Sequence, residues 1–318
     1  MSAPRRAPRE RVDAVLLLDK PAGITSNDAL MQVRRLLNAA KAGHGGTLDP
    51  MATGLLPIAL GEATKFLHDL LDADKTYEAE ISFGIATDTG DALGTEIARG
   101  PSEVTRSDLE VALGAFRGPI EQVPPMYSAL KRAGRPLYEY ARAGQTLERA
   151  ARTVTIHQLD LLALAPGSAR IRVACSKGTY VRTLAEDIGR ALGTVAHLSA
   201  LRRTRVGTLD ISAALRIELP LQLGGVDPEV LGAARAAVRA ALLPPDALIA
   251  TLPACVLDAA AAARFAHGQS VPCPVGVAAP LPSARVRVYR DEVLVGVGRL
   301  DGAGMIAPER VVGQTSGT

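Results

Sequence analysis

Asp49 is the only carboxylate in residues 43–57, which read GHGGTLDPMATGLLP. Pro50 disfavours a helical conformation for the residue before it, so we expect Asp49 to be extended. The glycines of this segment allow sharp turns and close approach to a ligand. A carboxylate held on such a rim can act as a nucleophile, a base or an electrostatic partner. The alternative is a turn, because Asp-Pro commonly begins one.

No metal or cofactor is expected from the remaining chemistry-bearing residues. The five histidines are scattered, and the three cysteines Cys175, Cys255 and Cys273 form no CxxC pair. The sequence has neither a P-loop nor a GxGxxG-type nucleotide fingerprint. Unpaired cysteines fit a reducing compartment, and the apolar run near the N-terminus is too short for a signal peptide. We therefore predict a cytoplasmic protein that does not enter a membrane.

Positive charge is concentrated in one part of the chain. The net charge is only +3, yet residues 131–152 contain six basic and two acidic residues, a local net of +4. Aromatic residues are scarce at 3%, and two tyrosines lie in this basic segment. The pattern indicates either a nucleic-acid contact or a solvated helix face.

The elements that must position these residues mix strands and helices without a regular βαβ rhythm, which predicts an α+β fold. Residues 77–83 alternate as a half-buried strand, residues 26–38 form an amphipathic helix, and residues 118–152 are expected to be irregular. We predict a disordered basic arm at 1–11, a main domain at 12–250 and a small β-domain at 251–314. The β-domain is expected to contain a hairpin that turns at Asp291-Glu292.

Five ordered segments make the chain recognisable. They are LLLDKPAGITSNDAL, GHGGTLDPMATGLLPIALGEATKF, KTYEAEISFGIATDTGDALG, VPPMYSALKRAGRPLYEYARAG and CSKGTYVRTLAEDIG. In order and spacing they resemble the bacterial TruB family of tRNA pseudouridine synthases, over about residues 12–210. One departure is Gly45, where many relatives carry threonine. The resemblance implies a mixed or antiparallel sheet flanked by helices, followed by a PUA-like RNA-binding domain.

The resemblance also implies roles for individual residues. Asp49 matches the catalytic aspartate, Tyr77 the tyrosine that stacks on the target base, and Arg182 the arginine that pairs with the aspartate. Further substrate-binding positions match Tyr180, Leu201, His44 and Lys20. Residues 118–152 match an insertion that contacts RNA, with Lys131, Arg132, Arg135 and Arg142 as its contacts. We expect additional phosphate contacts from Lys177, Arg202, Arg203 and Arg205.

The implied reaction converts uridine 55 in the T-loop of tRNA to pseudouridine after the base is flipped out of the RNA. It needs no cofactor, because substrate and product balance in atoms and oxidation level. The partner is the T-arm of tRNA; no protein partner is required, and the enzyme is expected to be a monomer. Asp49 can attack C1′, remove the C2′ proton or add to C6, and the sequence does not choose among these routes.

Three other functions are compatible with parts of the sequence. The chain can be a tRNA-binding or tRNA-folding module without chemistry, or a pseudouridine synthase for another RNA. Asp88 and Asp91 also suggest a carboxylate-pair glycoside hydrolase, although loop formation explains them better. Replacement of Asp49 by Asn separates the enzyme from the binding module.

Overall fold

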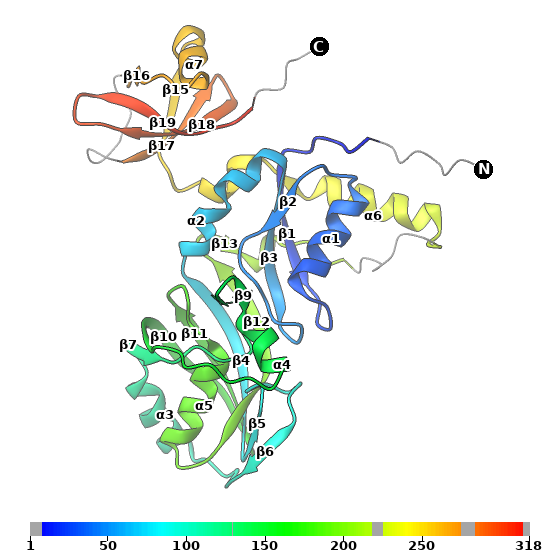
Figure 1. Cartoon of the computed structure of the whole chain (residues 1–318), viewed down its shortest axis with the longest axis vertical. Helices are drawn as coiled ribbons and strands as arrows, with labels where there is room; N and C mark the ends of the chain where they lie inside the picture. Colours follow the sequence, from blue (N-terminus) through cyan, green and yellow to red (C-terminus); the bar gives the residue numbers. More distant parts are fainter. Residues whose placement is uncertain (1–7, 129, 218–224, 275–283, 314–318) are drawn as a thin grey trace.

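The computed structural model describes residues 8–128, 130–217, 225–274 and 284–313. Its main domain is built on a ten-stranded sheet with the order β14-β1-β3-β12-β4-β11-β10-β7, in which β13 pairs with β12 and β2 pairs with β3. All strand pairs in this sheet are antiparallel except β12 with β3. The predicted α+β class is therefore confirmed (Figure 1).

One half of the sheet carries the alternating strands found in the sequence. Its strands are β4 (Lys75–Phe83), β11 (Ser168–Cys175), β10 (Arg152–Ala165) and β7 (Gly118–Gln122). In β4, Ala79, Ile81 and Phe83 are buried while Glu80 is exposed. Helices α3 (Arg106–Ala115) and α5 (Val181–Ala191) pack their apolar residues into the same core as these strands. Burial on one face thus produces the observed period of two.

The other half of the sheet is covered on both faces. It contains β1 (Ala14–Lys20), β2 (Ala42–His44), β3 (Thr53–Leu60) and β14 (Leu242–Leu243), while β12 (Ala196–Val206), with β13 (Leu209–Asp210) at its end, joins the two halves. In β1, Leu16 and Leu18 enter the core below α1 (Ser26–Leu36) and α6 (Pro228–Ala240), whereas Val15 and Leu17 enter a second core. Burial of both faces explains why this strand is continuously apolar.

Helix starts follow the capping signals in the sequence. Thr25 caps α1 and forms a capping box with Asp28, whose backbone N–H donates to the Thr25 side chain. Pro228 is the first residue of α6 and does not interrupt it. Proline is favoured there because the N–H it lacks has no partner in the first helical turn.

Two segment predictions differ from the structure. Residues 118–122 are not irregular but form β7, whose residues pair with the start of β10. Pro119 is tolerated because β7 is an edge strand. The predicted arm at 1–11 lies partly outside the described residues. In its described part, the Glu10 N–H donates to the Asn38 carbonyl, and the Glu10 carboxylate forms an ion pair with Arg239 of α6. These contacts hold residue 10 against the main domain.

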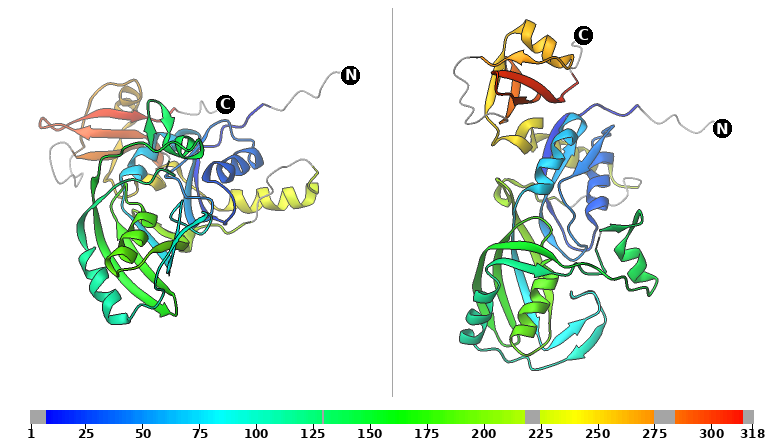
Figure 2. Two further views of the ribbon diagram at one scale, coloured as in Figure 1. Left: turned by 60° about the horizontal axis from the view of Figure 1, so that its bottom comes forward. Right: turned by 60° about the vertical axis from the view of Figure 1, so that its left-hand side comes forward.

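The segment predicted to contact RNA, residues 118–152, begins with β7. It contains the short strands β8 (Lys131–Arg132) and β9 (Arg135–Pro136), followed by α4 (Leu137–Arg142). A second small hairpin, β5 (Ile85–Thr87) with β6 (Glu96–Arg99), follows β4. Figure 2 shows the β8, β9 and α4 segment projecting from the body of the main domain.

The C-terminal domain is a five-stranded sheet with the order β15-β17-β18-β19-β16 and one helix. Its elements are β15 (Ala254–Leu257), α7 (Ala259–Ala266), β16 (Val271–Pro272), β17 (Arg285–Arg290), β18 (Val293–Leu300) and β19 (Met305–Val311). The predicted hairpin is present, since β17 and β18 pair around Asp291 and Glu292. Phe265 of α7 is fully buried in its core.

The two domains share an apolar and charged junction. The main domain contributes η1 (Gly61–Phe66), α2 (Leu67–Asp72) and η3 (Pro245–Ile249), which lie below the C-terminal domain (Figure 1). Val297 of β18 joins the core that contains Phe66 and Leu70. Arg285 forms an ion pair with Asp69 across the junction. The domains therefore pack as one body along this face.

A close backbone crossing near the centre of the sheet yields a stability prediction. Gly54 of β3 has φ +102°, and a Cβ there would lie 2.3 Å from the carbonyl oxygen of Arg203. We expect Gly54→Ala to lower the free energy of unfolding by more than about 2 kcal/mol, because both the conformation and the space exclude a side chain. Chemical denaturation of the two proteins measures this difference.

The matched control is Gly232→Ala in α6, where a Cβ would meet no atom within 4 Å. Alanine is the better helix former, so this change should be neutral or stabilise by up to about 1 kcal/mol. Equal effects of the two substitutions would contradict the close crossing at Gly54.

Candidate active site

The structure brings Asp49 and Arg182 together, although they are 133 positions apart in the sequence. The Arg182 Nε atom lies 3.1 Å from Asp49 Oδ2. The Arg182 side chain is 6% exposed and that of Asp49 is 36% exposed. The carboxylate is therefore accessible, while the guanidinium that orients it is held inside the protein. This is the pairing expected from the sequence.

Three further groups surround the Arg182 guanidinium. Nη1 donates to the carbonyl oxygen of Thr89 at 3.0 Å and lies 3.6 Å from Asp91 Oδ2. Nη2 donates to the carbonyl oxygen of Tyr127 at 2.6 Å. One side chain thus joins the Asp49 loop, the loop after β5 and the beginning of the insertion. Such a fixed fork of donors is a property of arginine that lysine lacks.

The backbone around Asp49 is held from the side of β1 and α1. Leu48 donates its N–H to Ser26 Oγ at 2.7 Å, and Ser26 Oγ donates to the Leu48 carbonyl at 3.0 Å. Gly23 donates its N–H to the carbonyl of Pro50 at 2.8 Å. The residues on both sides of Asp49 are therefore tied to the start of α1. The loop presents its carboxylate from a constrained backbone.

The N-terminus of α5 is positioned by β7. The Tyr180 N–H donates to Gln122 Oε1 at 3.0 Å, and Gln122 Nε2 donates to the Tyr180 carbonyl at 3.3 Å. Gln122 is the last residue of β7 and is 1% exposed. These two bonds fix the start of the helix that carries Arg182. Tyr180 itself is partly buried beside the site.

Tyr77 and Leu201 lie on one face of the sheet. Tyr77 on β4 is directly opposite Arg203 on β12, and Leu201 is opposite Ala79 two positions along. Because side chains alternate along strands, Tyr77 and Leu201 point to the same side. Burial raises the pKa of Tyr77, and the charge of Asp49 acts in the same direction. The charge of Arg203 opposes this rise in the pKa of Tyr77.

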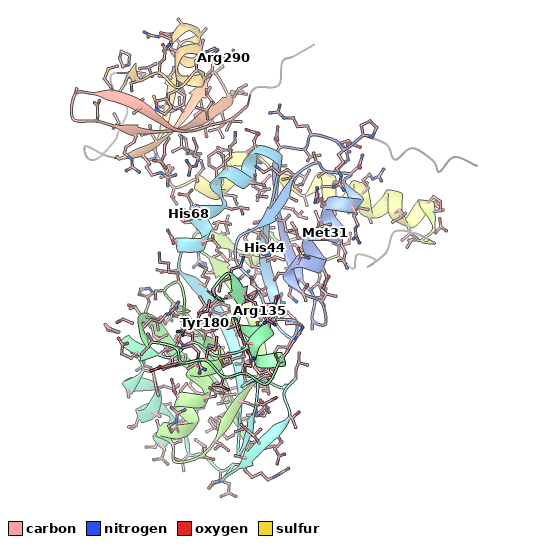
Figure 3. The ribbon with its side chains drawn as sticks, viewed as in Figure 1. Met31, His44, His68, Arg135, Tyr180 and Arg290 are labelled. Atoms are coloured by element: carbon pink, nitrogen blue, oxygen red, sulfur yellow. The ribbon has the colours of Figure 1, made fainter. Side chains whose placement is uncertain are left out.

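His44 belongs to the same loop as Asp49, and Lys20 Nζ lies 3.5 Å from the Pro50 carbonyl of that loop. Lys20 is fully buried, and its Nζ donates to the carbonyls of Pro21 and Ile24 at 2.8 Å. Burial lowers the pKa of Lys20 to about 8, although Asp49 opposes the shift. Burial also lowers the pKa of His44, whose Nδ1 atom is buried without a hydrogen-bond partner. His44, Tyr180 and Arg135 fall in the middle of the molecule in Figure 3.

Burial controls the charge of Asp49 more strongly than its arginine partner does. Desolvation raises the pKa of Asp49, Arg182 lowers it, and the neighbouring charge of Asp91 raises it again. The pKa of Asp49 is therefore raised from its ordinary value, which makes its carboxylate a stronger base than that of a solvated aspartate.

The four predicted RNA contacts of the insertion are exposed. Arg132 donates to the carbonyl of Glu148, Arg135 pairs with Glu139 at 2.8 Å, and Arg142 stacks over Tyr138 at 5.5 Å. Lys131 is exposed on β8. Each of these cations can still reach solvent, because only part of its surface is used by the protein.

The additional phosphate contacts predicted from the sequence have protein partners. Lys177 pairs with Asp72 at 2.7 Å, Arg202 with Asp19 at 2.7 Å and Arg205 with Asp210 at 3.2 Å. For Arg203 the prediction is wrong, since this side chain is 1% exposed. A strand residue faces either solvent or the core, and the sequence RRTR does not reveal which arginine points inward.

Two site residues were missed or misread in the sequence. Asp91 was interpreted as loop-forming, and it does accept hydrogen bonds from Thr89 Oγ1 and Leu93 N, but its second oxygen faces Arg182. Gln122 carried no signal at all, because a buried glutamine cannot be told from a surface one by its neighbours in sequence. The motif TDTGD was the available signal for Asp91.

Comparison with known proteins assigns the family. The chain matches the family model for the N-terminal domain of TruB pseudouridylate synthases at residues 34–181. Two C-terminal TruB models match residues 182–249 and 253–312. The fold and site thus define a pseudouridine synthase, an isomerase. The chain belongs to the TruB family of pseudouridylate synthases.

Similar enzymes from other organisms align with nearly the whole chain. The tRNA pseudouridine synthase B of Aromatoleum aromaticum is 55% identical, over 96% of this chain and 95% of its own length. That of Ralstonia pickettii is 53% identical, over 97% of each chain. Among solved structures, a chain in a Cbf5-Nop10-Gar1 complex aligns with a TM-score of 0.68 at 27% identity, over 94% of this chain and 84% of that one. Among the described helices, none is long and apolar enough to cross a membrane.

The charge arrangement yields a prediction for the acid titration of Asp49. The negative charge of Asp91 raises the pKa of Asp49, so Asp91→Asn should lower it and move the titration midpoint to a lower pH. Carbon NMR of the side-chain carboxyl measures that midpoint. Because the folded-state pKa is raised, ionisation of Asp49 costs stability as pH rises through this range, and the variant should lose less stability there.

The control for this titration is Asp88→Asn in the same loop. Asp88 is exposed and accepts a hydrogen bond from the Thr95 N–H, with no ion pair to Arg182. This change should leave the Asp49 midpoint in place. A midpoint that rises in Asp91→Asn would contradict the arrangement of charges.

Proposed function

We propose that the chain isomerises uridine 55 in the T-loop of tRNA to pseudouridine, with Asp49 as the catalytic residue. The observation that carries the proposal is an accessible carboxylate held 3.1 Å from a buried guanidinium. The names of the related enzymes support tRNA as substrate. The choice of uridine 55 rests on the sequence resemblance. The cytoplasmic location and the monomeric state stay predictions.

The reaction requires one bond to break and one to form. The C1′–N1 bond breaks, the uracil turns, C1′ bonds to C5, and the proton on C5 leaves while N1 gains one. Asp49 begins this sequence by attacking C1′, by removing the C2′ proton or by adding to C6. Arg182 aims the carboxylate in each route, because its guanidinium is immobilised by the Thr89 and Tyr127 carbonyls.

The base must leave the RNA stack before it reaches Asp49. Flipping costs a few kcal/mol, and stacking on an aromatic ring such as Tyr77 returns about 1–3 kcal/mol. Contacts between phosphates and the exposed cations of the insertion supply the remaining binding energy. The insertion passes next to the site, since the Tyr127 carbonyl accepts a hydrogen bond from Arg182.

The first prediction from this function concerns Asp49→Asn. The amide keeps the size of the side chain but cannot act as a nucleophile or base, so we expect the single-turnover rate to fall by at least about 100-fold. Affinity for tRNA should stay within about threefold, because RNA binding depends mainly on phosphate contacts. The assay incubates the protein with unmodified tRNA and maps pseudouridine by chemical derivatisation.

Asp160→Asn on β10 is the control, since it makes the same chemical change at a carboxylate outside the site. A tRNA with cytidine at position 55 tests the target position. Substantial turnover by Asp49→Asn would contradict a catalytic role for this residue. Product at another uridine would reject the target while leaving the chemistry intact.

The second prediction concerns the insertion. Reversal of charge at Arg132, Arg135 and Arg142 should weaken tRNA binding and reduce the slope of log affinity against log salt. Each lost phosphate contact is worth about 0.7–0.9 in that slope. Binding measured by filter retention at several salt concentrations gives the slope.

The matched control reverses three exposed arginines of the lower part of the main domain: Arg99, Arg106 and Arg190. This variant has the same net charge as the first, so general repulsion of RNA is equal in both. If both variants lose the same affinity, the insertion is a solvated surface and not an RNA contact.

A further inference from the structure

Arg203 lies at the centre of the main sheet. On β12 it is paired with Gly54 of β3 on one side and with Tyr77 of β4 on the other. Its side chain is among the largest fully buried ones of the described chain, and the residue is 1% exposed. An arginine in this place cannot reach an RNA phosphate. Its guanidinium must act inside the protein.

The guanidinium donates to backbone carbonyls on both sides of Asp49. Nη2 lies 3.1 Å from the Gly46 oxygen and Nη1 3.5 Å from the Thr47 oxygen, both ahead of Asp49 in sequence. Nε lies 2.8 Å from the oxygen of Leu55, which follows it. Arg203 therefore spans the base of the loop and fixes the distance between its two ends.

No carboxylate forms an ion pair with Arg203 among the residues that the structure describes. Burial of a charge is costly unless polar groups surround it. Here the carbonyl dipoles of the loop take the place of a counter-ion. The loop conformation and the buried charge therefore depend on each other. Without the loop carbonyls the guanidinium would lack acceptors, and without the guanidinium those carbonyls would lack a donor.

The loop backbone is shaped to meet this side chain. Gly46 has φ +109°, and a Cβ on it would lie 3.5 Å from Arg203 Nη1. At Gly54 the approach is closer still, since the Cβ would meet the Arg203 backbone. Glycine at both positions lets the ends of the loop close around the arginine.

We propose that Arg203 is a positioning residue for the reaction, which holds the Asp49 loop through the carbonyls of Gly46, Thr47 and Leu55. Ser26 holds the same loop from its other side, at Leu48. Asp49 therefore lies between Leu48, which Ser26 holds, and Leu55, which Arg203 holds. The inference rests on the proposed catalytic role of Asp49, and it adds the group that sets the place of the carboxylate.

The test compares Arg203→Gln and Arg203→Lys with the unchanged protein in single-turnover assays on unmodified tRNA. Glutamine cannot bridge the two ends of the loop, so the rate should fall by about 10- to 100-fold, as expected when a reacting group is displaced by about 1 Å. Lysine keeps the charge but has one nitrogen, and it should recover part of the rate. Affinity for tRNA should stay within about twofold, because no phosphate contact is lost.

A local readout separates positioning from general packing. In Arg203→Gln, hydrogen exchange should accelerate at the amides of Gly45, Leu48 and Ala52, whose N–H groups donate within or from the loop. Amides of β10 and β11 should keep their protection. Arg172→Gln is the control, because this exposed residue pairs with Glu78 on the same strand as Tyr77 and touches no loop carbonyl.

Three results would overturn the proposal. A rate unchanged in Arg203→Gln removes the positioning role. Weaker tRNA binding with a reduced salt slope and an unchanged rate makes Arg203 a phosphate contact. Faster exchange throughout the protein, equal in Arg203→Lys, makes it a packing residue only. If the unchanged protein forms no pseudouridine while the loop still opens in Arg203→Gln, the proposed function fails and the structural attachment stands.

Discussion

The guanidinium of Arg182 is the point on which the site depends. It contacts the Asp49 carboxylate, the Asp91 carboxylate and the carbonyls of Thr89 and Tyr127. These partners come from three segments that are far apart in the sequence. Because the guanidinium is planar and almost fully buried, each partner has one direction from which it can approach. Folding of the sheet brings α5 to this place, and the three loops take their positions around it.

Buried cations around Asp49 are satisfied mainly by backbone carbonyls. Lys20 donates to Pro21 and Ile24, and Arg203 donates to Gly46 and Leu55. Carbonyl dipoles solvate these charges without neutralising them, so their field extends to neighbouring groups. It lowers the pKa of His44, after the larger effect of burial, and opposes the rise in the pKa of Asp49 caused by desolvation. The positive field and burial thus act against each other at the carboxylate.

Local physics explains which parts of the structure were predictable. The period of two in β4 requires only neighbouring residues, and it was found from the sequence. The adjacency of Asp49 and Arg182 came from the family resemblance. The inward direction of Arg203 depends on which face of β12 is covered, and β7 depends on pairing with a strand 30 residues away in the chain. Such long-range partners leave no mark on their own local sequence.

The Asp49 loop is also linked to the C-terminal domain by packing. A Cβ on Gly45 would lie 2.6 Å from Leu70 Cδ1, so the loop rests directly on α2. Asp69 directly precedes Leu70 in α2, and it forms an ion pair with Arg285 of β17. On the same face Lys65 Nζ donates to the carbonyl of Val311 at 2.7 Å. A larger residue at position 45 would therefore require the Leu70 side chain to move, and Leu70 belongs to the core that Val297 of the C-terminal domain joins.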